Sequence, residues 1–235
     1  MAADPNRESA PRDSCLHNSG LRDSCLHDAG LRERKKASTR EALAWAAIRL
    51  AAERGLENVR VDDIAEEAGV STRTYNNYFS SREEAICAAS VERARRVGDA
   101  LLARPTEEPL HEAIVHAVVD QHTRGGEPGR TTATHLRLII KSPALRGEML
   151  KGMEAGEANL AEAIAERSGT DPEQDPFPRI LAAAVFGASR VAVEYWLRPG
   201  ATAAYRDLLR EAVTIAAGIA RTRGDTATAR ETTAS

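Results

Sequence analysis

The stretch VDDIAEEAGVSTRTYNNYFSSR, residues 61–82, decides the fold of the N-terminal half of the chain. The apolar residues of its first part recur at helical spacing: Val61, Ile64, Ala65 and Ala68. Gly69 follows them, and glycine readily adopts the left-handed backbone found just past a helix end. The pattern therefore predicts a short amphipathic helix that ends at a tight turn.

A second short helix is predicted from Thr72 to Phe79, after Ser71, whose hydroxyl can accept an unpaired backbone N–H as an N-cap. Its exposed side is expected to carry hydrogen-bond donors and acceptors, with one cation and no carboxylate: Thr72, Arg73, Tyr75, Asn76, Asn77 and Tyr78. This composition suits a helix that lies against a polyanion. The two helices and their turn are predicted to form a helix-turn-helix.

A longer pattern, over about residues 38 to 87, resembles the N-terminal DNA-binding domain of the tetracycline-repressor (TetR-like) family. The residues that carry it are Gly55, Leu56, Val61, Asp63-Ile64-Ala65, Ala68-Gly69-Val70-Ser71, Thr74, Tyr78-Phe79 and Ser81-Arg82-Glu83. An ordered pattern of this length is much more specific than a lone motif. The resemblance implies a dimeric DNA-binding protein, and the C-terminal part of the chain carries no comparable pattern.

The resemblance also implies roles for single residues. Ser71 and Tyr78 are expected near phosphates, and Thr74 is expected to face inward or bind backbone. Arg82 stands where the family usually has Lys, which keeps the positive charge. Arg60 stands where the family usually has a Thr or Ser cap; losing the cap costs on the order of 1 kcal/mol, but the longer cation could reach a phosphate.

Two further kinds of DNA contact are predicted. Arg73 is the best candidate for reading a base because Arg pairs bidentately with guanine, and Asn76, where the family usually has an aromatic residue, could pair with adenine or be a plain surface substitution. The basic run that ends in Lys35 and Lys36 directly precedes the first predicted helix, Thr39 to Arg54. It is predicted to contact phosphates, with a solvated charge cluster as the alternative.

Composition points to an all-α protein. The 235 residues are rich in strong helix formers, only 4% are aromatic, and the net charge is −3, which a DNA-binding protein tolerates because only the surface facing phosphates must be positive. There is no apolar window of about 18 residues and no apolar core near the N-terminus, so neither a membrane span nor a signal peptide is predicted. Three cysteines make no disulfide framework, and a cytoplasmic location is expected.

The N-terminal tail contains a tandem repeat, DSCLHNSGLR at 13–22 and DSCLHDAGLR at 23–32. Duplication of a short coding segment explains it, and the alternative is a zinc site made by Cys15, His17, Cys25 and His27. Since Cys-x-His is not the spacing of common zinc motifs, no metal or other cofactor is predicted. The expected organisation is a flexible extension with a basic arm (1–36), a three-helix DNA-binding domain (37–87), a helical ligand-binding and dimerisation domain (88–223) and a disordered tail (224–235).

Six helices are predicted after residue 80: 81–103, 109–122, 131–141, 145–167, 178–197 and 201–221. The last two carry broad faces of small and apolar residues. They are predicted to pair with the same helices of a second chain as a four-helix bundle, and the alternative is that they complete the core of a monomer.

The helices of the second domain are expected to enclose a mostly apolar cavity with a few polar anchors. Its candidate lining residues, each of which could instead be purely structural, are His116, His122, His135, Met149, Met153, Phe186, Arg190, Glu194 and Trp196. The sequence thus predicts a ligand-responsive regulator, a repressor that binds a palindromic operator in double-stranded DNA as a homodimer. A DNA-binding accessory protein without a small-molecule ligand is the first alternative. A helical enzyme is disfavoured because no Ser/His/Asp order, carboxylate pair or HExxH set occurs.

Overall fold

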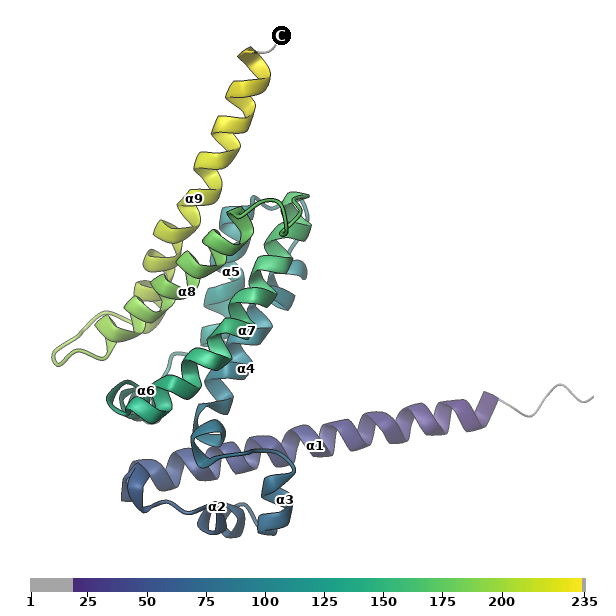
Figure 1. The fold of residues 1–235 in the computed structure, drawn as a ribbon, viewed down its shortest axis with the longest axis vertical. Helices are drawn as coiled ribbons and strands as arrows, with labels where there is room; N and C mark the ends of the chain where they lie inside the picture. The colour runs from purple at the N-terminus through teal and green to yellow at the C-terminus, as the bar shows by residue number, and fades with distance from the viewer. Residues whose placement is uncertain (1–18, 234–235) are drawn as a thin grey trace, which may run out of the picture. The chain divides into compact units, whose positions relative to one another are not determined.

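The computed structural model describes residues 19–233, with side chains described for 31–32 and 34–221. Over this range the chain forms nine α-helices and one 3₁₀ turn and no strand, which confirms the all-α prediction (Figure 1). The elements are α1 (Ser19–Arg54), η1 (Leu56–Asn58), α2 (Val61–Glu67), α3 (Thr72–Asn76), α4 (Arg82–Leu102), α5 (Leu110–Thr123), α6 (Arg130–Lys141), α7 (Pro143–Ser168), α8 (Phe177–Trp196) and α9 (Tyr205–Thr233).

Two helices are longer than predicted. α1 begins at Ser19 rather than Thr39, because no proline interrupts residues 19–54 and strong helix formers dominate the second half of that range. α9 runs to Thr233 and so includes most of residues 224–235, for which a disordered tail was predicted; no proline occurs in this range.

The helix-turn-helix is present as predicted, but its second helix ends at Asn76 rather than at Phe79. α2 ends before Gly69, which has φ 69°, and α3 follows after the turn. Buried side chains from the C-terminal part of α1, from α2, from α3 and from the start of α4 form one apolar cluster, with Leu50, Ile64 and Ile86 among its fully buried members. Neither short helix has enough surface to be stable alone, so this shared cluster holds both in place.

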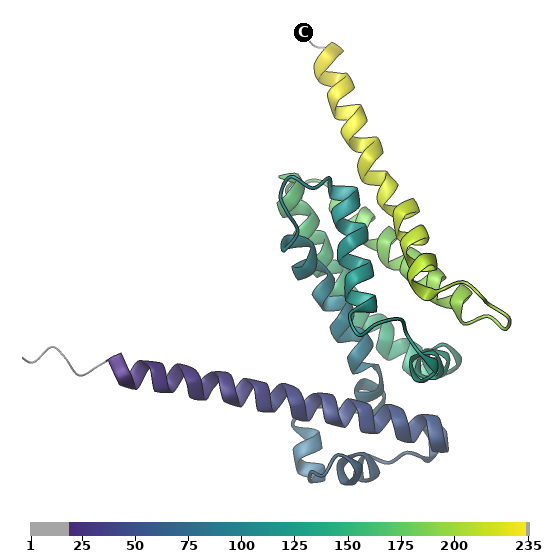
Figure 2. The same cartoon turned by 180° about the vertical axis from the view of Figure 1, so that it is seen from behind.

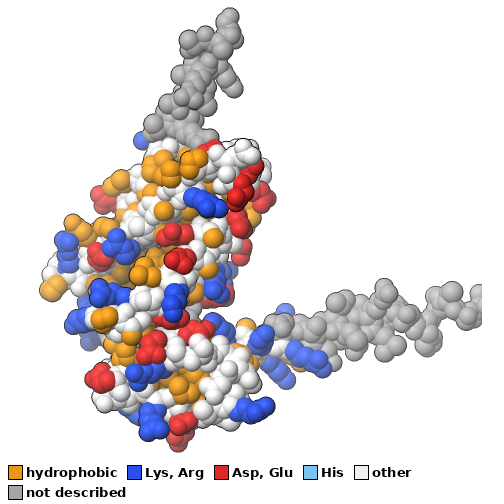
Figure 3. All heavy atoms as spheres, in the orientation of Figure 1, with side chains coloured by type: hydrophobic (Ala, Val, Ile, Leu, Met, Phe, Trp, Pro, Cys, Tyr) orange, Lys and Arg blue, Asp and Glu red, His pale blue; other side chains and the backbone are white. Residues whose placement is uncertain are grey.

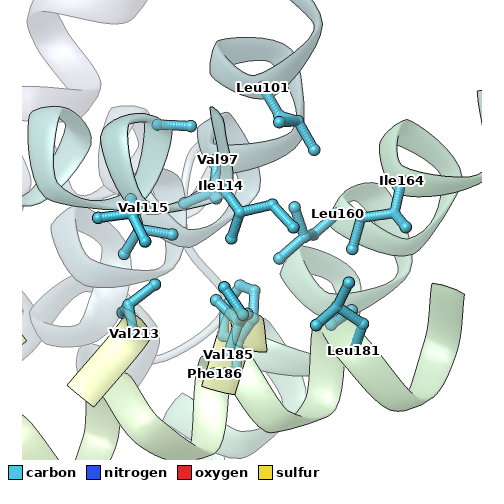
Figure 4. Packing of buried hydrophobic residues seen from close by; sticks show 14 of the residues in the cluster. Val97, Leu101, Ile114, Val115, Leu160, Ile164, Leu181, Val185, Phe186 and Val213 are labelled. Carbon is cyan, nitrogen blue, oxygen red and sulfur yellow. The ribbon is translucent and has the colours of Figure 1, made fainter. Parts of the chain in front are cut away.

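A second apolar cluster is built by α4, α5, α7, α8 and α9. Figure 4 shows its centre, where Val97 and Leu101 of α4 meet Ile114 of α5 and Leu160 of α7. The predicted boundary between residues 87 and 88 falls inside α4, so the two clusters share one continuous helix.

The helices of this second cluster pack in pairs. α4 lies along α7 and α8 lies along α9 (Figure 1), while α5 packs on both α4 and α9 (Figure 2). The contact of α4 with α7 is especially close at Gly98 and Gly152, where a Cβ atom would overlap Asn159 and Val91, respectively. Residues without a side chain therefore set the distance between these two helices.

The corner between α4 and α5 is held by Arg167 in the last turn of α7. Its guanidinium donates to four backbone carbonyls, those of Leu101 at 3.4 Å, Arg104 at 3.0 Å, Pro105 at 2.8 Å and Glu108 at 3.0 Å. The carbonyls of Leu101 and Pro105 also accept the backbone N–H groups of Arg104 and Glu108, so Arg167 adds to the hydrogen bonds that already shape this corner.

None of the described helices combines the length and the apolar character needed to span a bilayer.

Candidate DNA-binding surface and effector site

The turn between α2 and α3 is fixed by side-chain hydrogen bonds. Ser71 Oγ accepts from the backbone N–H of Thr74 at 3.1 Å and lies 2.9 Å from Thr74 Oγ1, so Ser71 is the predicted N-cap. Thr72 Oγ1 donates to Asp62 Oδ1 at 2.8 Å and ties α3 to α2. These hydroxyls hold the geometry of the turn, and the predicted DNA contacts of Ser71 and Thr72 would add to this structural role.

The outer side of α3 carries polar side chains that remain available for hydrogen bonds to DNA. Arg73, Asn76 and Asn77 are exposed, and their side chains make no hydrogen bond or ion pair with any described residue. Tyr78 is half-buried next to them. A cation and two amides on a rigidly held helix can donate to phosphates and base edges.

Tyr75 does not belong to this surface, so its predicted exposure was wrong. Its side chain is fully buried, its ring packs on Phe79 with centroids 5.8 Å apart, and its O–H donates to the carbonyl of Ser81 at 2.7 Å. Burial, together with the nearby Glu84, raises the pKa of this phenol. Tyr75 therefore ties α3 to the start of α4 and is a core residue.

Two cations flank the helix-turn-helix. Arg82 Nη1 donates to the carbonyl of Val59 at 2.7 Å and Arg82 Nε to Glu83 at 2.9 Å, so this residue holds the chain before α2 against α4. Arg60 is exposed, its side chain makes no capping hydrogen bond, and its backbone N–H donates to Asp63 Oδ2 at 3.0 Å. Asp63 thus makes the return half of a capping box, while the Arg60 side chain cannot accept a helix N–H as a Thr or Ser hydroxyl would.

The chain divides into two units, and the described part of the first is residues 19–42. Within it Lys35 and Lys36 are exposed. Of the alternative zinc ligands, Cys15 and His17 lie outside the described residues, and the side chains of Cys25 and His27 are not among the described ones. The described side chains contain no group of three or more residues arranged to hold a metal ion.

The core of the helix-turn-helix continues into α6 and α7. Ile139 of α6 and Leu145 of α7 are buried members of its apolar cluster. The ring of His135, also buried, donates from Nε2 to the carbonyl of Ile86 at 2.8 Å, and Cys87 Sγ donates to the carbonyl of Leu145 at 3.5 Å. A shift of α6 would therefore disturb the packing beneath the DNA-facing helices.

The nine predicted effector-lining residues lie in different parts of the second domain. Met153 and Phe186 belong to its central cluster, whereas Met149 and His135 pack on the helix-turn-helix core. Arg190 and Glu194 form an exposed ion pair of 2.6 Å on α8. His116 donates from Nδ1 to Glu108 at 2.6 Å near the α4–α5 corner. There the Arg104 guanidinium, and to a lesser extent His116, lower the pKa of Glu108 to about 2.

The two remaining predicted residues, His122 and Trp196, lie together. The Tyr205 ring at the start of α9 lies 5.2 Å from the Trp196 ring and 6.4 Å from the His122 ring. Burial lowers the pKa of His122 to about 4, with a further contribution from Arg93 on α4. The Nδ1–H of His122 donates to the carbonyl of Val118 at 2.9 Å.

Arg93 and Tyr205 are two members of this group that the sequence did not single out. Arg93 lies seven residues after Ile86 and four before Val97, on the same helical face, and a cation in line with buried residues was the available signal.

A capped helix-turn-helix with an exposed cation and amides, joined through shared packing to a larger helical domain, defines a DNA-binding regulator. The comparisons with known proteins agree. The family model of tetR-family bacterial regulatory proteins matches residues 45–86, and that of the MftR C-terminal domain matches residues 108–220. The chain belongs to the TetR family of transcriptional regulators.

Two relatives share most of its length. The HTH-type transcriptional regulator TcmR of Streptomyces glaucescens is 34% identical over 170 residues, which cover 70% of this chain and 75% of TcmR. MftR of Mycobacterium tuberculosis, whose name assigns it to the regulation of mycofactocin biosynthesis, is 26% identical over 165 residues, covering 70% of this chain and 83% of MftR. Both are transcriptional regulators by name.

Among solved structures, the fatty acid degradation regulator FadR of Bacillus halodurans has the same fold. It superposes with a TM-score of 0.54 at 20% identity, covering 77% of this chain and 95% of FadR.

Proposed function

We propose that this regulator is a cytoplasmic repressor that binds a palindromic operator as a homodimer and releases it when a small, mostly apolar effector binds the second domain. The DNA contacts would be made by the exposed side of α3, with Arg73 and Asn76 at base edges. Arg60, Tyr78 and the basic run with Lys35 and Lys36 would contact phosphates.

The observation that carries the ligand response is the shared packing of the two clusters. Ile139 and Leu145 are buried in the core of the helix-turn-helix, and His135 bonds to the backbone of α4 at Ile86. An effector that binds better to one arrangement of α4 and α6 than to another would change the population competent to bind DNA, and DNA would affect effector affinity equally.

Dimerisation is supported by apolar side chains that α8 and α9 leave exposed: Ile180, Val191, Tyr195, Ile215 and Ile219. Figure 3 shows hydrophobic side chains at the surface on the face that carries α8. Ile215 alone has 74% of its surface accessible. A second chain that covers these two helices would remove this apolar surface from water and place two recognition helices on one duplex.

The test is a mobility-shift and footprinting experiment with the DNA that flanks the gene of this protein. We expect one fragment to be bound with high specificity, with a symmetrical footprint whose half-sites are spaced by about one helical turn and an affinity that falls steeply with salt. Arg73→Ala should weaken this binding, and Arg95→Ala, an exposed arginine on α4, serves as the matched control. Equal binding to every fragment would refute specific operator recognition.

The effector is tested on the same fragment. Compounds that raise the thermal stability of the protein should also release the DNA, because one binding site is proposed for both effects. Specific DNA binding that no stabilising compound releases would favour the accessory protein without a ligand.

A further inference from the structure

Arg93, in the middle of α4, is a cation that pairs with none of the described residues. Its side chain is half-buried and makes no ion pair or hydrogen bond with any side chain or backbone group that the structure describes. The neighbouring arginines behave differently: Arg95 and Arg96 are exposed, and Arg96 pairs with Glu92 at 2.9 Å. A guanidinium has five N–H donors, and withdrawing it from water without a partner is unfavourable.

The groups that face Arg93 come from three other helices and are uncharged. Arg93 acts electrostatically on His122 of α5, His135 of α6 and Tyr205 of α9. Burial lowers the pKa of both histidines and raises that of the Tyr205 phenol, so all three are neutral near pH 7. None of them can balance the charge of Arg93.

The described carboxylate that acts on Tyr205 already accepts a hydrogen bond. Glu127, in the loop between α5 and α6, acts on Tyr205, and its Oε1 accepts from the backbone N–H of Arg206 at 3.1 Å. The two histidines donate their N–H groups to the backbone carbonyls of Val118 and Ile86. The guanidinium of Arg93 therefore remains as the strongest available donor among these side chains.

We propose that Arg93 binds the anionic group of an organic acid, and that such an acid, with an apolar body, is the effector class of this regulator. The guanidinium fork matches two oxygens of a carboxylate or a similar oxyanion. The protonated Tyr205 supplies a neutral O–H donor on the neighbouring helix, and the partly buried Trp196 ring, 5.2 Å from Tyr205, supplies an apolar surface for the body of the ligand. This inference rests on the proposed ligand-responsive function and names the chemistry that the ligand must have.

The test uses two fluorescent probes with the same aromatic skeleton, one anionic (8-anilinonaphthalene-1-sulfonate) and one neutral (N-phenyl-1-naphthylamine). We expect the full-length wild-type protein to bind the anionic probe saturably. Arg93→Met should weaken this binding about tenfold or more, the size expected for losing charge-assisted hydrogen bonds, and leave the neutral probe unaffected. Arg93→Lys should keep part of the affinity, because it retains the charge but not the fork. Arg95→Met, from the exposed side of the same helix, is the control and should change neither probe.

A second measurement needs no variant, in case Arg93→Met does not fold. On the wild-type protein, 1-naphthoate should displace the anionic probe at a concentration at which the neutral 1-naphthamide does not. Absence of saturable binding of the anionic probe, equal loss of both probes in folded Arg93→Met, or equal displacement by naphthoate and naphthamide would each overturn the proposal.

The outcome separates this inference from the proposed function. If the protein binds a specific operator and a compound releases it, but Arg93→Met has no effect on the anionic probe, the inference fails and the function stands. If binding of the anionic probe depends on Arg93 but no DNA fragment is bound specifically, the anion site stands and the proposed function fails.

Discussion

Replacing His122 by Phe should make the stability of the protein less sensitive to acid. His122 has a pKa of about 4 in the folded chain, against 6.5 for an ordinary histidine, mainly because partial burial disfavours its charged form and secondly because of the positive charge of Arg93. Below pH 6.5 His122 becomes protonated in the unfolded chain but stays neutral in the folded chain until the pH approaches 4. The free energy of unfolding therefore falls as the pH drops from 6.5 to about 4, and it is insensitive to this group above pH 7.

The size of the effect follows from the two pKa values. At about 1.4 kcal/mol per pH unit, the full difference is worth up to about 3 kcal/mol, of which about 2 kcal/mol should be lost between pH 7 and pH 5. Phe cannot take up a proton and fits beside the Tyr205 ring, so the variant should lack this part of the acid sensitivity. His135, whose pKa is also lowered by burial, should remain responsible for a further part in both proteins.

The assay is urea unfolding followed by circular dichroism at several pH values between 5 and 7.5. The quantity compared is the loss of unfolding free energy between pH 7 and pH 5 in the wild type and in His122→Phe. His111→Gln, a half-exposed histidine on the same helix α5, is the matched control and should behave like the wild type. If His122→Phe lost as much stability as the wild type over this range, His122 would not be held neutral by its surroundings, and the reasoning would be refuted.

Three other outcomes are expected. Arg73→Ala should cost about 1–3 kcal/mol in operator binding and relax the preference at one base position, as measured by titrations with single-base operator variants; uniform weakening on all sequences would show that Arg73 reads no base. Tyr75→Phe should lower the unfolding free energy by about 1 kcal/mol through loss of the hydrogen bond to Ser81, with base preference unchanged. Ile215→Lys should give monomers in sedimentation and abolish operator binding, whereas the exposed Thr214→Lys should stay dimeric; a dimeric Ile215→Lys would place the interface elsewhere.

The helix-turn-helix could be predicted from sequence because its signals are local. Ser71 accepts its hydrogen bond from Thr74, three residues away, and Gly69 takes up its positive φ directly after α2. Such signals act within a few residues and depend little on the rest of the fold.

The burial of Tyr75 could not be predicted in this way. α3 has only five residues, too few for a helical period to separate an inner from an outer face. The partner of the Tyr75 hydroxyl, the carbonyl of Ser81, lies beyond the end of the helix. Tyr78, an aromatic residue three positions on, is half-buried, so residue type alone does not separate the two positions.

The candidate effector residues show a related limit. Arg190 and Glu194 are four residues apart with opposite charge, a spacing typical of a pair on an exposed helix face, and that is where the structure has them. Arg93 differs from Arg95 and Arg96 in sequence only by lying in line with Ile86 and Val97, and its electrostatic effect on His122, His135 and Tyr205 appears only in the folded chain. The residues on which Arg93 acts lie on three helices far away in the sequence, so its role cannot be deduced from the local sequence alone.

The Arg167 side chain also limits how this chain can vary in length. Its four acceptors, spread from Leu101 to Glu108, must all reach one planar guanidinium that is anchored at the end of α7. An insertion or deletion between residues 102 and 109 would move several carbonyls away from it at once, although surface loops usually tolerate such changes. The loop between α8 and α9, residues 197–204, has no comparable clamp among the described side chains and can change length more freely. Among natural variants of this chain, length differences should therefore collect at the α8–α9 connection, while the α4–α5 corner keeps a constant number of residues.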